Sequence, residues 1–440
     1  MNLYRKLLSD QVLVWIIRSL ILGLLIGPVI TLLTKAVGFV SSVRENSPLI
    51  ILAIPLGAFI TALLYQKVGP YLKEGGSQVI DMINQGILDI AHPSSIGYKK
   101  DQSDHTSNIS TKMAPLLFIS TCITHLVGAS GGKEGVGVQI GASIGSYLNR
   151  FETFLFSSKD IESNIKQEGI WLISGAGAAF GALFNAPIAG TLFGLQFSNP
   201  RVNRTDAMLP CLISSFTACI VSQALHTSTL IPVRAETITT DTKTLLILSF
   251  IAVIFGLASR LFCFIIHKTK EILNRITSNP YKKVLVSSSL LLLCSVSIYA
   301  LTGSFQYNGL SVDLIIQAEL GNVSPYAPVF KLLLTALTIG AGFMGGEVIP
   351  ILVIGATFGS LFASFLSIPV STLSMFGAIG MLSGSTKLPI ACFVLGLELF
   401  GFGNSLSLFL VCSIAYIASG RLGIYEKQIV PEVIGESWDV

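Results

Sequence analysis

Long apolar runs, interrupted by glycine and proline, dominate the hydrophobic pattern of this chain of 440 residues. Four runs have the length of a membrane-crossing helix, namely Gln11–Leu33, Leu49–Tyr65, Thr244–Ile266 and Val284–Leu301. A helix needs about 20 apolar residues to cross a hydrocarbon layer of about 30 Å. Two of the runs contain no charged residue, and the other two contain one arginine each, Arg18 and Arg260. The pattern therefore predicts an all-α, polytopic membrane protein.

The composition supports this prediction, because 51% of the residues are hydrophobic and only 12% are charged. Soluble domains carry about 25% charged residues. Basic residues cluster near the ends of the apolar runs, as at Lys268, Lys270 and Arg275, and the positive-inside rule places such ends in the cytoplasm. The net charge of +4 then reflects orientation in the bilayer, and no nucleic-acid partner is expected. We expect an integral, multi-pass protein of the cell (inner or plasma) membrane whose first helix is retained.

Cysteine and histidine usage gives no sign of a metal site or cofactor. The seven cysteines are scattered through apolar stretches without a CxxC pair, and the five histidines lack the spacing of metal ligands. We therefore expect buried free cysteines, no bound metal and no cofactor.

Two blocks of the chain resemble each other. Gly131–Ser146 (GGKEGVGVQIGASIGS) matches Gly345–Ser360 (GGEVIPILVIGATFGS) at seven of sixteen positions without a gap. Pro187–Phe197 matches Pro389–Leu399 at five of eleven. Small residues recur in any packed membrane helix, but this order and spacing favour a duplication. We expect two transmembrane halves, 1–225 and 226–440, in one membrane domain with no soluble regulatory domain. The longest polar segments, Pro93–Lys112 and Gly303–Pro328, are expected to be surface loops. Duplicated halves of transporters are commonly inverted, with the substrate site near the bilayer midplane.

Glycine-rich loops precede an apolar helix in both blocks. A helix that begins after such a loop exposes unpaired N–H groups and the positive end of its dipole. Two such helix starts, one from each half, can converge on a buried anion. Glycine permits this because it lets backbone amides approach the ion closely.

Three carboxylates lie near these loops or in the apolar helices. Ionisable residues inside a membrane are by default functional candidates. Glu134 would compete with an anion for the backbone amides, and on protonation it would lose its charge and leave, so it is the candidate gate and proton carrier. An ion pair with Lys133 at the membrane edge is the alternative. Glu347 lies in the matching loop and is either a second proton site or a structural residue near a helix N-terminus. Glu398 is expected to be structural, at a helix end.

An enzyme is not expected. Gly132-Lys133 resembles part of a phosphate-binding loop, but Glu134 stands where that motif requires Ser or Thr. Ser130 lies in a GxSG pattern, yet a nucleophile needs a base within hydrogen-bond reach, and the candidates are only His125 and His267.

Several segments resemble the CLC family of anion channels and transporters. Gly132–Val136 (GKEGV) resembles its gate signature G(K/R)EGP, and Gly346–Pro350 (GEVIP) resembles GxFxP. Phe184–Gln196 is similar to the helix that follows the gate, and Arg421–Ile429 to the terminal helix with the pore tyrosine. The resemblance runs from about Gly75 to Tyr425. It implies a duplicated, inverted-repeat helical fold with interrupted helices, and a homodimer with one anion pathway per subunit.

The resemblance also implies roles for individual residues. Glu134 would be the gating glutamate, the backbone amides of Glu347 and Val348 would coordinate the anion, and Tyr425 would contribute its hydroxyl. The family motif GSGIP is altered here to Gly75–Ile80 (GGSQVI), so that either Ser77 or Gln78 would face the ion at the inner gate.

One departure bears on proton coupling. Chloride/proton exchangers of the family often carry an inward glutamate where this chain has Gln196 and Phe197. The fluoride-exporting branch also lacks it and carries GGEV, as in Gly345–Val348, although Ile349 stands here where that branch tends to have Thr. We expect transport of a small halide, chloride or fluoride, coupled to proton antiport. The alternative is a passive voltage- or pH-gated chloride channel.

Overall fold

The computed structural model describes residues 2–69, 75–91, 109–156, 161–200, 204–226, 235–277, 279–366 and 368–430. Their regular structure is helical, apart from a single isolated β-bridge. The all-α prediction is therefore confirmed. The loop expected between Pro93 and Lys112 falls mostly outside the described residues.

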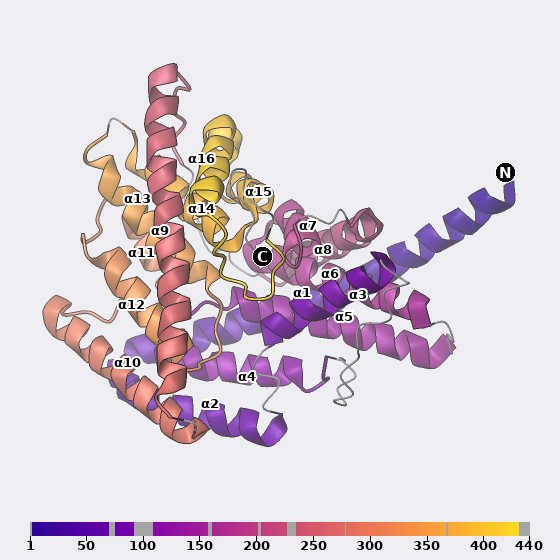
Figure 1. Ribbon diagram of the computed structural model, residues 1–440, viewed down its shortest axis with the longest axis horizontal. Coiled ribbons are helices and arrows are strands. Elements are labelled where there is room, and N and C mark those ends of the chain that lie inside the picture. The colour runs from indigo at the N-terminus through magenta and orange to yellow at the C-terminus, as the bar shows by residue number, and fades with distance from the viewer. Residues whose placement is uncertain are drawn as a thin grey trace, which may run out of the picture.

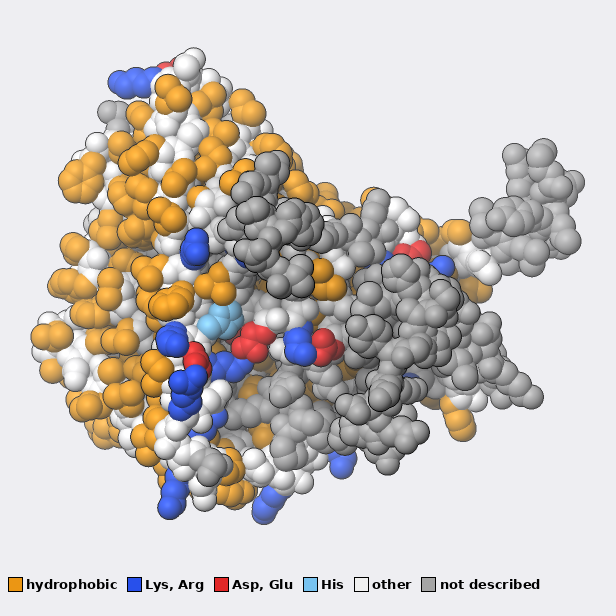
Figure 2. All heavy atoms as spheres, viewed as in Figure 1, with side chains coloured by type: hydrophobic (Ala, Val, Ile, Leu, Met, Phe, Trp, Pro, Cys, Tyr) orange, Lys and Arg blue, Asp and Glu red, His pale blue; other side chains and the backbone are white. Residues whose placement is uncertain are grey.

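Within the part of the chain that the structure describes, five helical segments are long and apolar enough to cross a membrane. They comprise α1 (Asn2–Asn46), a 3-10 turn (Pro48–Ala53) continued by α2 (Ile54–Val68), α8 (Thr205–Ala224), α9 (Thr242–Arg275) and α10 (Pro280–Thr302). Four contain the runs expected from the sequence. The fifth, α8, is less apolar, because serine and threonine are interspersed through it. Hydrophobic side chains cover the face over α9 and its neighbours, as expected for contact with lipid (Figure 2).

Shorter helices pack among these spans. They are α3 (Gly75–Ala91), α4 (Met113–Leu126), α5 (Glu134–Phe156), α6 (Ile161–Phe184), α7 (Pro187–Gln196), α11 (Asp313–Glu319), α12 (Ala327–Gly340), α13 (Val348–Ala363), α14 (Val370–Thr386), α15 (Pro389–Phe400) and α16 (Ser405–Ala418). Helices α1–α8 and α9–α16 occupy different sides of the molecule (Figure 1).

Equivalent glycines pack equivalent helices in the two parts of the chain. Gly141 of α5 lies against Gly175 of α6 so closely that neither has room for a Cβ atom. Gly355 of α13 and Gly377 of α14 make the same contact. Small residues allow this close approach of membrane helices. The packing thus repeats the sequence match between the two blocks.

The segment from Gly303 to Pro328 is not the surface loop expected from its polar composition. It contains α11, which packs against α13 and α14. Leu314 and Ile315 of this helix are buried, and so is Tyr307 before it. The loop prediction was wrong because a helix of two turns needs few apolar residues to bury one face.

Candidate functional site

The two glycine-rich loops matched in the sequence are in direct contact. The Gly132 N–H donates to the Gly346 carbonyl, and the Gly346 N–H donates to the Gly132 carbonyl, each at 2.6 Å. This pair is the isolated antiparallel β-bridge of the fold. A Cβ atom on Gly346 would lie 2.6 Å from the backbone nitrogen of Gly135, so only glycine fits there. The convergence expected from the sequence is therefore present.

Two helices begin at this bridge, one from each part of the chain. Glu134 is the first residue of α5, and Val348 is the first residue of α13, with Glu347 at its N-cap. The first N–H groups of a helix have no partner within the helix, and the dipole places positive charge there. The bridge thus brings two anion-attracting helix ends together.

The Glu134 side chain lies at the junction and is 0% exposed. Backbone amides of Lys133, Glu134 and Ile349 are its electrostatic partners, so both parts of the chain act on it. Neither carboxylate oxygen makes a hydrogen bond of normal geometry to a described residue. A buried carboxylate is unfavourable unless it is paired, and an ionisable group inside a membrane protein is by default a functional candidate.

Lys133 is also buried, with 3% of its surface exposed. It attracts the Glu134 carboxylate electrostatically, but no direct ion pair joins them in the part of the chain that the structure describes. The alternative expected from the sequence, an ion pair at the membrane edge, does not describe this geometry. A buried lysine here raises the local positive potential around the two helix ends.

Glu347 and Tyr425 share this region. The Glu347 side chain does not cap α13. Instead, the Glu347 side chain lies beside the loop that precedes α5. Its Oε2 is 3.9 Å from the position that a Cβ atom on Gly135 would take. Tyr425 is close enough to interact electrostatically with both Glu134 and Glu347. Three residues far apart in the sequence are thus brought to one place.

The segment that carries Tyr425 is held against the end of α14. The Ile424 N–H donates to the Ser385 carbonyl at 2.8 Å, and Gln428 Nε2 donates to the Thr386 carbonyl at 3.0 Å. Gln428 Nε2 also donates to the Phe197 carbonyl at 3.1 Å. Phe197, which stands where exchangers often have a glutamate, is buried and stacks on Phe193.

Ser77 and Gln78 lie in the first turn of α3, a third helix start. A Cβ atom on Gly76 would be 3.1 Å from Gln139 Nε2, so this start faces α5. Gln78 Oε1 is buried and has no hydrogen-bond partner among the described residues. The choice between Ser77 and Gln78 stays open.

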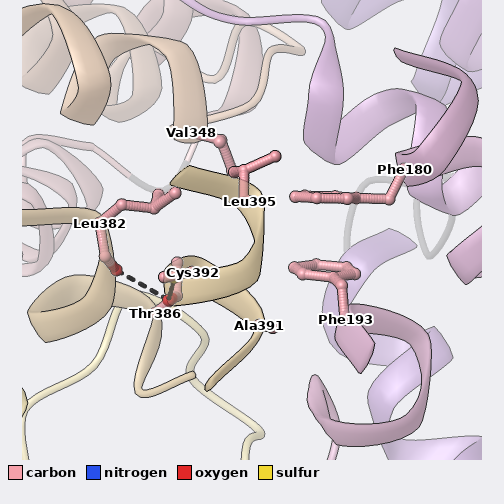
Figure 3. A pocket seen from close by; sticks show the side chains of 8 residues that line it. All are labelled: Phe180, Phe193, Val348, Leu382, Thr386, Ala391, Cys392 and Leu395. Atoms are coloured by element: carbon pink, nitrogen blue, oxygen red, sulfur yellow. Dashed lines mark hydrogen bonds between the residues drawn. The ribbon is translucent and has the colours of Figure 1, made fainter. Parts of the chain in front are cut away.

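A small, partly open cavity lies where the two parts of the chain meet, beside Val348 (Figure 3). Its volume of about 10 Å³ corresponds to roughly one water-sized species. Phe180 and Phe193 form one wall with rings stacked at 4.0 Å, and α13, α14 and α15 form the other. In that wall the Thr386 hydroxyl donates to the Leu382 carbonyl at 2.7 Å. Sequence reasoning missed Phe180 and Thr386, because isolated residues of these types carry no signal in an apolar helix.

Glu398 is structural, as expected, but it caps a helix of the other part of the chain. Its carboxylate accepts hydrogen bonds from the backbone N–H groups of Ile188 and Ala189, at 3.0 and 2.8 Å. These amides belong to the first turn of α7. A carboxylate is favourable at a helix N-terminus because it pairs with unsatisfied amides and with the dipole.

Ser130 and His125 do not form a nucleophile and base. The Ser130 hydroxyl is hydrogen-bonded to the Thr335 hydroxyl at 3.0 Å, and its N–H donates to Thr338 Oγ1 at 2.9 Å. Neither ring nitrogen of His125 makes a hydrogen bond of normal geometry to a described residue, and Ser130 is not its partner. The geometry required for nucleophilic catalysis is not formed between them.

Comparison with known proteins agrees with this architecture. A family model described as "Voltage gated chloride channel" matches residues 57–420. A "Chloride/fluoride channel protein" of Pseudomonas syringae pathovar tomato is 29% identical over 425 residues, covering 94% of this chain and 86% of the relative. An "H(+)/Cl(-) exchange transporter ClcA" of Vibrio parahaemolyticus is 25% identical over 432 residues, covering 93% of this chain and 87% of the relative.

Solved structures share the fold. The crystal structure of a CLC-type fluoride/proton antiporter has a TM-score of 0.84 at 29% identity, covering 95% of this chain and 98% of that one. The structure of a slow cyanobacterial Cl⁻/H⁺ antiporter has a TM-score of 0.71 at 18% identity, covering 92% of this chain and 94% of that one. The duplicated helical fold with interrupted helices expected from the sequence is therefore the fold of this chain.

Proposed function

Because the chain belongs to the CLC family of voltage-gated chloride channels and their relatives, we propose that it exchanges a small halide, chloride or fluoride, for protons across the membrane. One observation carries this proposal. The Gly132–Gly346 bridge brings two helix N-termini together beside a buried carboxylate that has no hydrogen-bond partner among the described residues. Helix ends attract anions, and the carboxylate both competes with an anion and accepts a proton.

Glu134 is the gate in this proposal. When ionised it occupies the positive field of α5 and α13 and excludes a halide. When protonated it loses that attraction, leaves the helix ends, and carries its proton with it. A halide then takes its place at the same backbone amides, with Val348 among them. One group thereby couples the two fluxes in opposite directions.

Glu347 is proposed as the second proton site, on the other side of the bridge residue Gly346. Its position beside Gly135 and within electrostatic range of Tyr425 supports this role. Tyr425 is proposed to donate its hydroxyl to the anion. Ser77 or Gln78, at the start of α3, is proposed to face the anion from the inner side.

Fluoride is the favoured halide. Two proteins whose names include fluoride are each 29% identical to this chain, and they cover most of its length. The GGEV sequence of Gly345–Val348 and the Phe197 side chain in place of an inward glutamate agree with that branch. A passive chloride channel remains the competing function, since a chain without the inward glutamate could conduct without protons.

The test is a flux measurement in proteoliposomes. A halide gradient is imposed with no proton gradient, and internal pH is followed together with halide efflux. Exchange predicts proton movement against the halide, and a proton ionophore should then speed net efflux. Halide efflux without proton movement would instead establish the passive channel.

We further propose a homodimer built from two copies of this duplicated chain, with the halves 1–225 and 226–440. Ile188 of α7 and Ile390 of α15 occupy matching positions and are both well exposed, at 45% and 41%. They lie on neighbouring helices, since α7 packs against α15. Cysteine substitution at Ile188, followed by cross-linking in membranes, tests whether this face meets a second copy.

A further inference from the structure

An open groove lies on the outer side of α9, separate from the proposed anion pathway. Its volume is about 620 Å³. It is lined by Leu257, Arg260, Leu261 and Phe264 of α9, and by Arg421 and Leu422, which follow α16. Its three apolar side chains from α9 are each more than half exposed, as expected on a surface that faces lipid.

Arg260 is unusual in this setting. It is the only charged residue between Thr244 and Ile266, and its side chain has no hydrogen bond or ion pair among the described residues. A charged side chain at membrane depth is costly unless it reaches a partner or the headgroup region. Lys268 begins the basic end of the same helix about 12 Å further along, at 1.5 Å per residue. The long arginine side chain can extend toward that headgroup level.

The groove also combines two arginines with no acidic residue in its lining. A guanidinium group binds phosphate through two parallel hydrogen bonds, which makes arginine well suited to phosphate recognition. Leu257, Leu261 and Phe264 form an apolar wall of the same groove, next to the two arginines.

We propose that this groove binds an anionic phospholipid. The lipid phosphate contacts Arg260 and Arg421, and an acyl chain lies along Leu257, Leu261 and Phe264. The two arginines come from elements far apart in the sequence, so the lipid joins α9 to the segment after α16.

That segment leads to the candidate anion ligand. A Cβ atom on Gly420 would lie 3.5 Å from an Arg260 guanidinium nitrogen, so the arginine borders the segment. The buried Lys387 holds the same turn by donating to the Gly420 carbonyl and the Ser419 hydroxyl, both at 2.7 Å. Tyr425 follows five residues after Gly420. A lipid bound here therefore stabilises the segment that positions Tyr425.

Native mass spectrometry of the purified full chain tests the proposal, with phosphatidylglycerol and phosphatidylcholine of equal chain length as probes. The parent protein should retain phosphatidylglycerol in preference, and inorganic phosphate at the same concentration should not displace it. Arg260→Gln and Arg421→Gln should each weaken retention about tenfold or more, as expected for the loss of a hydrogen bond to a charged group. Arg275→Gln is the matched control, because Arg275 is 77% exposed at the end of the same helix and outside the groove.

Besides displacement by inorganic phosphate, two results would overturn the proposal. One is equal retention of both lipids by the parent protein, a measurement that does not depend on any variant folding. The other is unchanged preference in the Arg260→Gln/Arg421→Gln double variant. Displacement by inorganic phosphate would instead identify a site for the free ion and would also exclude the lipid.

Discussion

At the scale of single residues, Glu134 combines burial with the absence of a fixed partner. A structural carboxylate accepts hydrogen bonds, as the partly buried Glu398 does from two backbone amides. Glu134 is fully buried, yet its oxygens make no hydrogen bond of normal geometry to described residues. A group held only by the field of nearby amides can leave when its charge is removed. This contrast is the reason for proposing that Glu134 moves during transport and that Glu398 does not.

The first prediction concerns this group. Glu134→Gln fixes the side chain in a neutral state, so halide flux should continue while proton coupling is lost. Proton movement driven by a halide gradient should fall to the level of empty liposomes. The pH dependence of halide flux should also disappear, because the titrating group is gone. If the variant keeps the parent's pH dependence, Glu134 is not the gate.

The second prediction separates Glu347 from Glu134. Glu347→Gln leaves the backbone amides of α13 in place, so halide binding should persist while the ratio of protons to halide falls. Glu319→Gln is a matched control, since Glu319 is another buried carboxylate with an oxygen that lacks a partner among the described residues, on α11. The control should keep the parent's ratio. An unchanged ratio in Glu347→Gln would make that carboxylate structural.

The sequence indicated the polar residues that the structure brings together in the candidate site, but not the apolar ones beside them. Glu134, Glu347 and Tyr425 stand in short signatures, and charge in an apolar chain is conspicuous. Phe180, Phe193 and Thr386 line the cavity, but nothing distinguishes them from other helix-packing residues until the chain is folded. The capping of α7 by Glu398 could not be predicted either, because the bonded residues are about 210 positions apart in the sequence.

At the scale of elements, the bridge between the two loops determines where α5 and α13 begin. Its geometry depends on the absence of side chains. A Cβ atom on Gly346 would lie only 2.6 Å from the Gly135 nitrogen, and Cβ atoms on Gly132 and Gly135 would lie 3.0 and 3.2 Å from backbone atoms of Gly346. Any shift of one loop therefore moves both helix ends away from the place where they meet.

The third prediction tests the bridge. In Gly346→Ala the new methyl group would lie 2.6 Å from the Gly135 nitrogen, so the loops must separate. Overpacking of this kind costs about 1–3 kcal/mol, and the misplaced amides should lower halide flux strongly. Gly38→Ala is the control, because nothing lies within 4 Å of its Cβ position. That control should keep full flux and gain about 0.5–1 kcal/mol from the more helix-favouring alanine.

The fourth prediction concerns the cap between α15 and α7. Glu398→Ala removes both acceptors for the Ile188 and Ala189 amides. Thermal unfolding in detergent should show a loss of about 0.5–2 kcal/mol, the range measured for N-cap residues. Glu398→Gln keeps one acceptor oxygen and should recover part of that loss. Equal stability of the parent and the alanine variant would contradict a capping role.

At the scale of the whole molecule, four of the long apolar spans followed from hydrophobic run length, and the match between the two glycine-rich loops followed from the internal repeat. The short α11 did not, since seven residues with one buried face resemble a loop in composition. The span α8 was also missed, because its serines and threonines lower its hydropathy. Several of these hydroxyls are satisfied inside the fold, as when Ser214 donates to the Ser174 carbonyl at 3.1 Å. A polar residue in a membrane helix is thus tolerated where neighbouring helices accept its hydrogen bond.

The last prediction concerns the transport cycle as a whole, because exchange and conduction differ in how a pH gradient acts. If halide and protons are exchanged, an inward-directed proton gradient alone should drive halide out of proteoliposomes against its own gradient. A passive channel cannot do this, since it only lets halide move down its electrochemical gradient. The measurement uses fluoride and chloride in parallel with the membrane potential clamped by potassium and valinomycin. Fluoride should be driven out faster than chloride, and the Glu134→Gln protein, reconstituted at equal density, should drive neither. If only chloride moves uphill, the protein is an exchanger, but its halide is chloride and not fluoride.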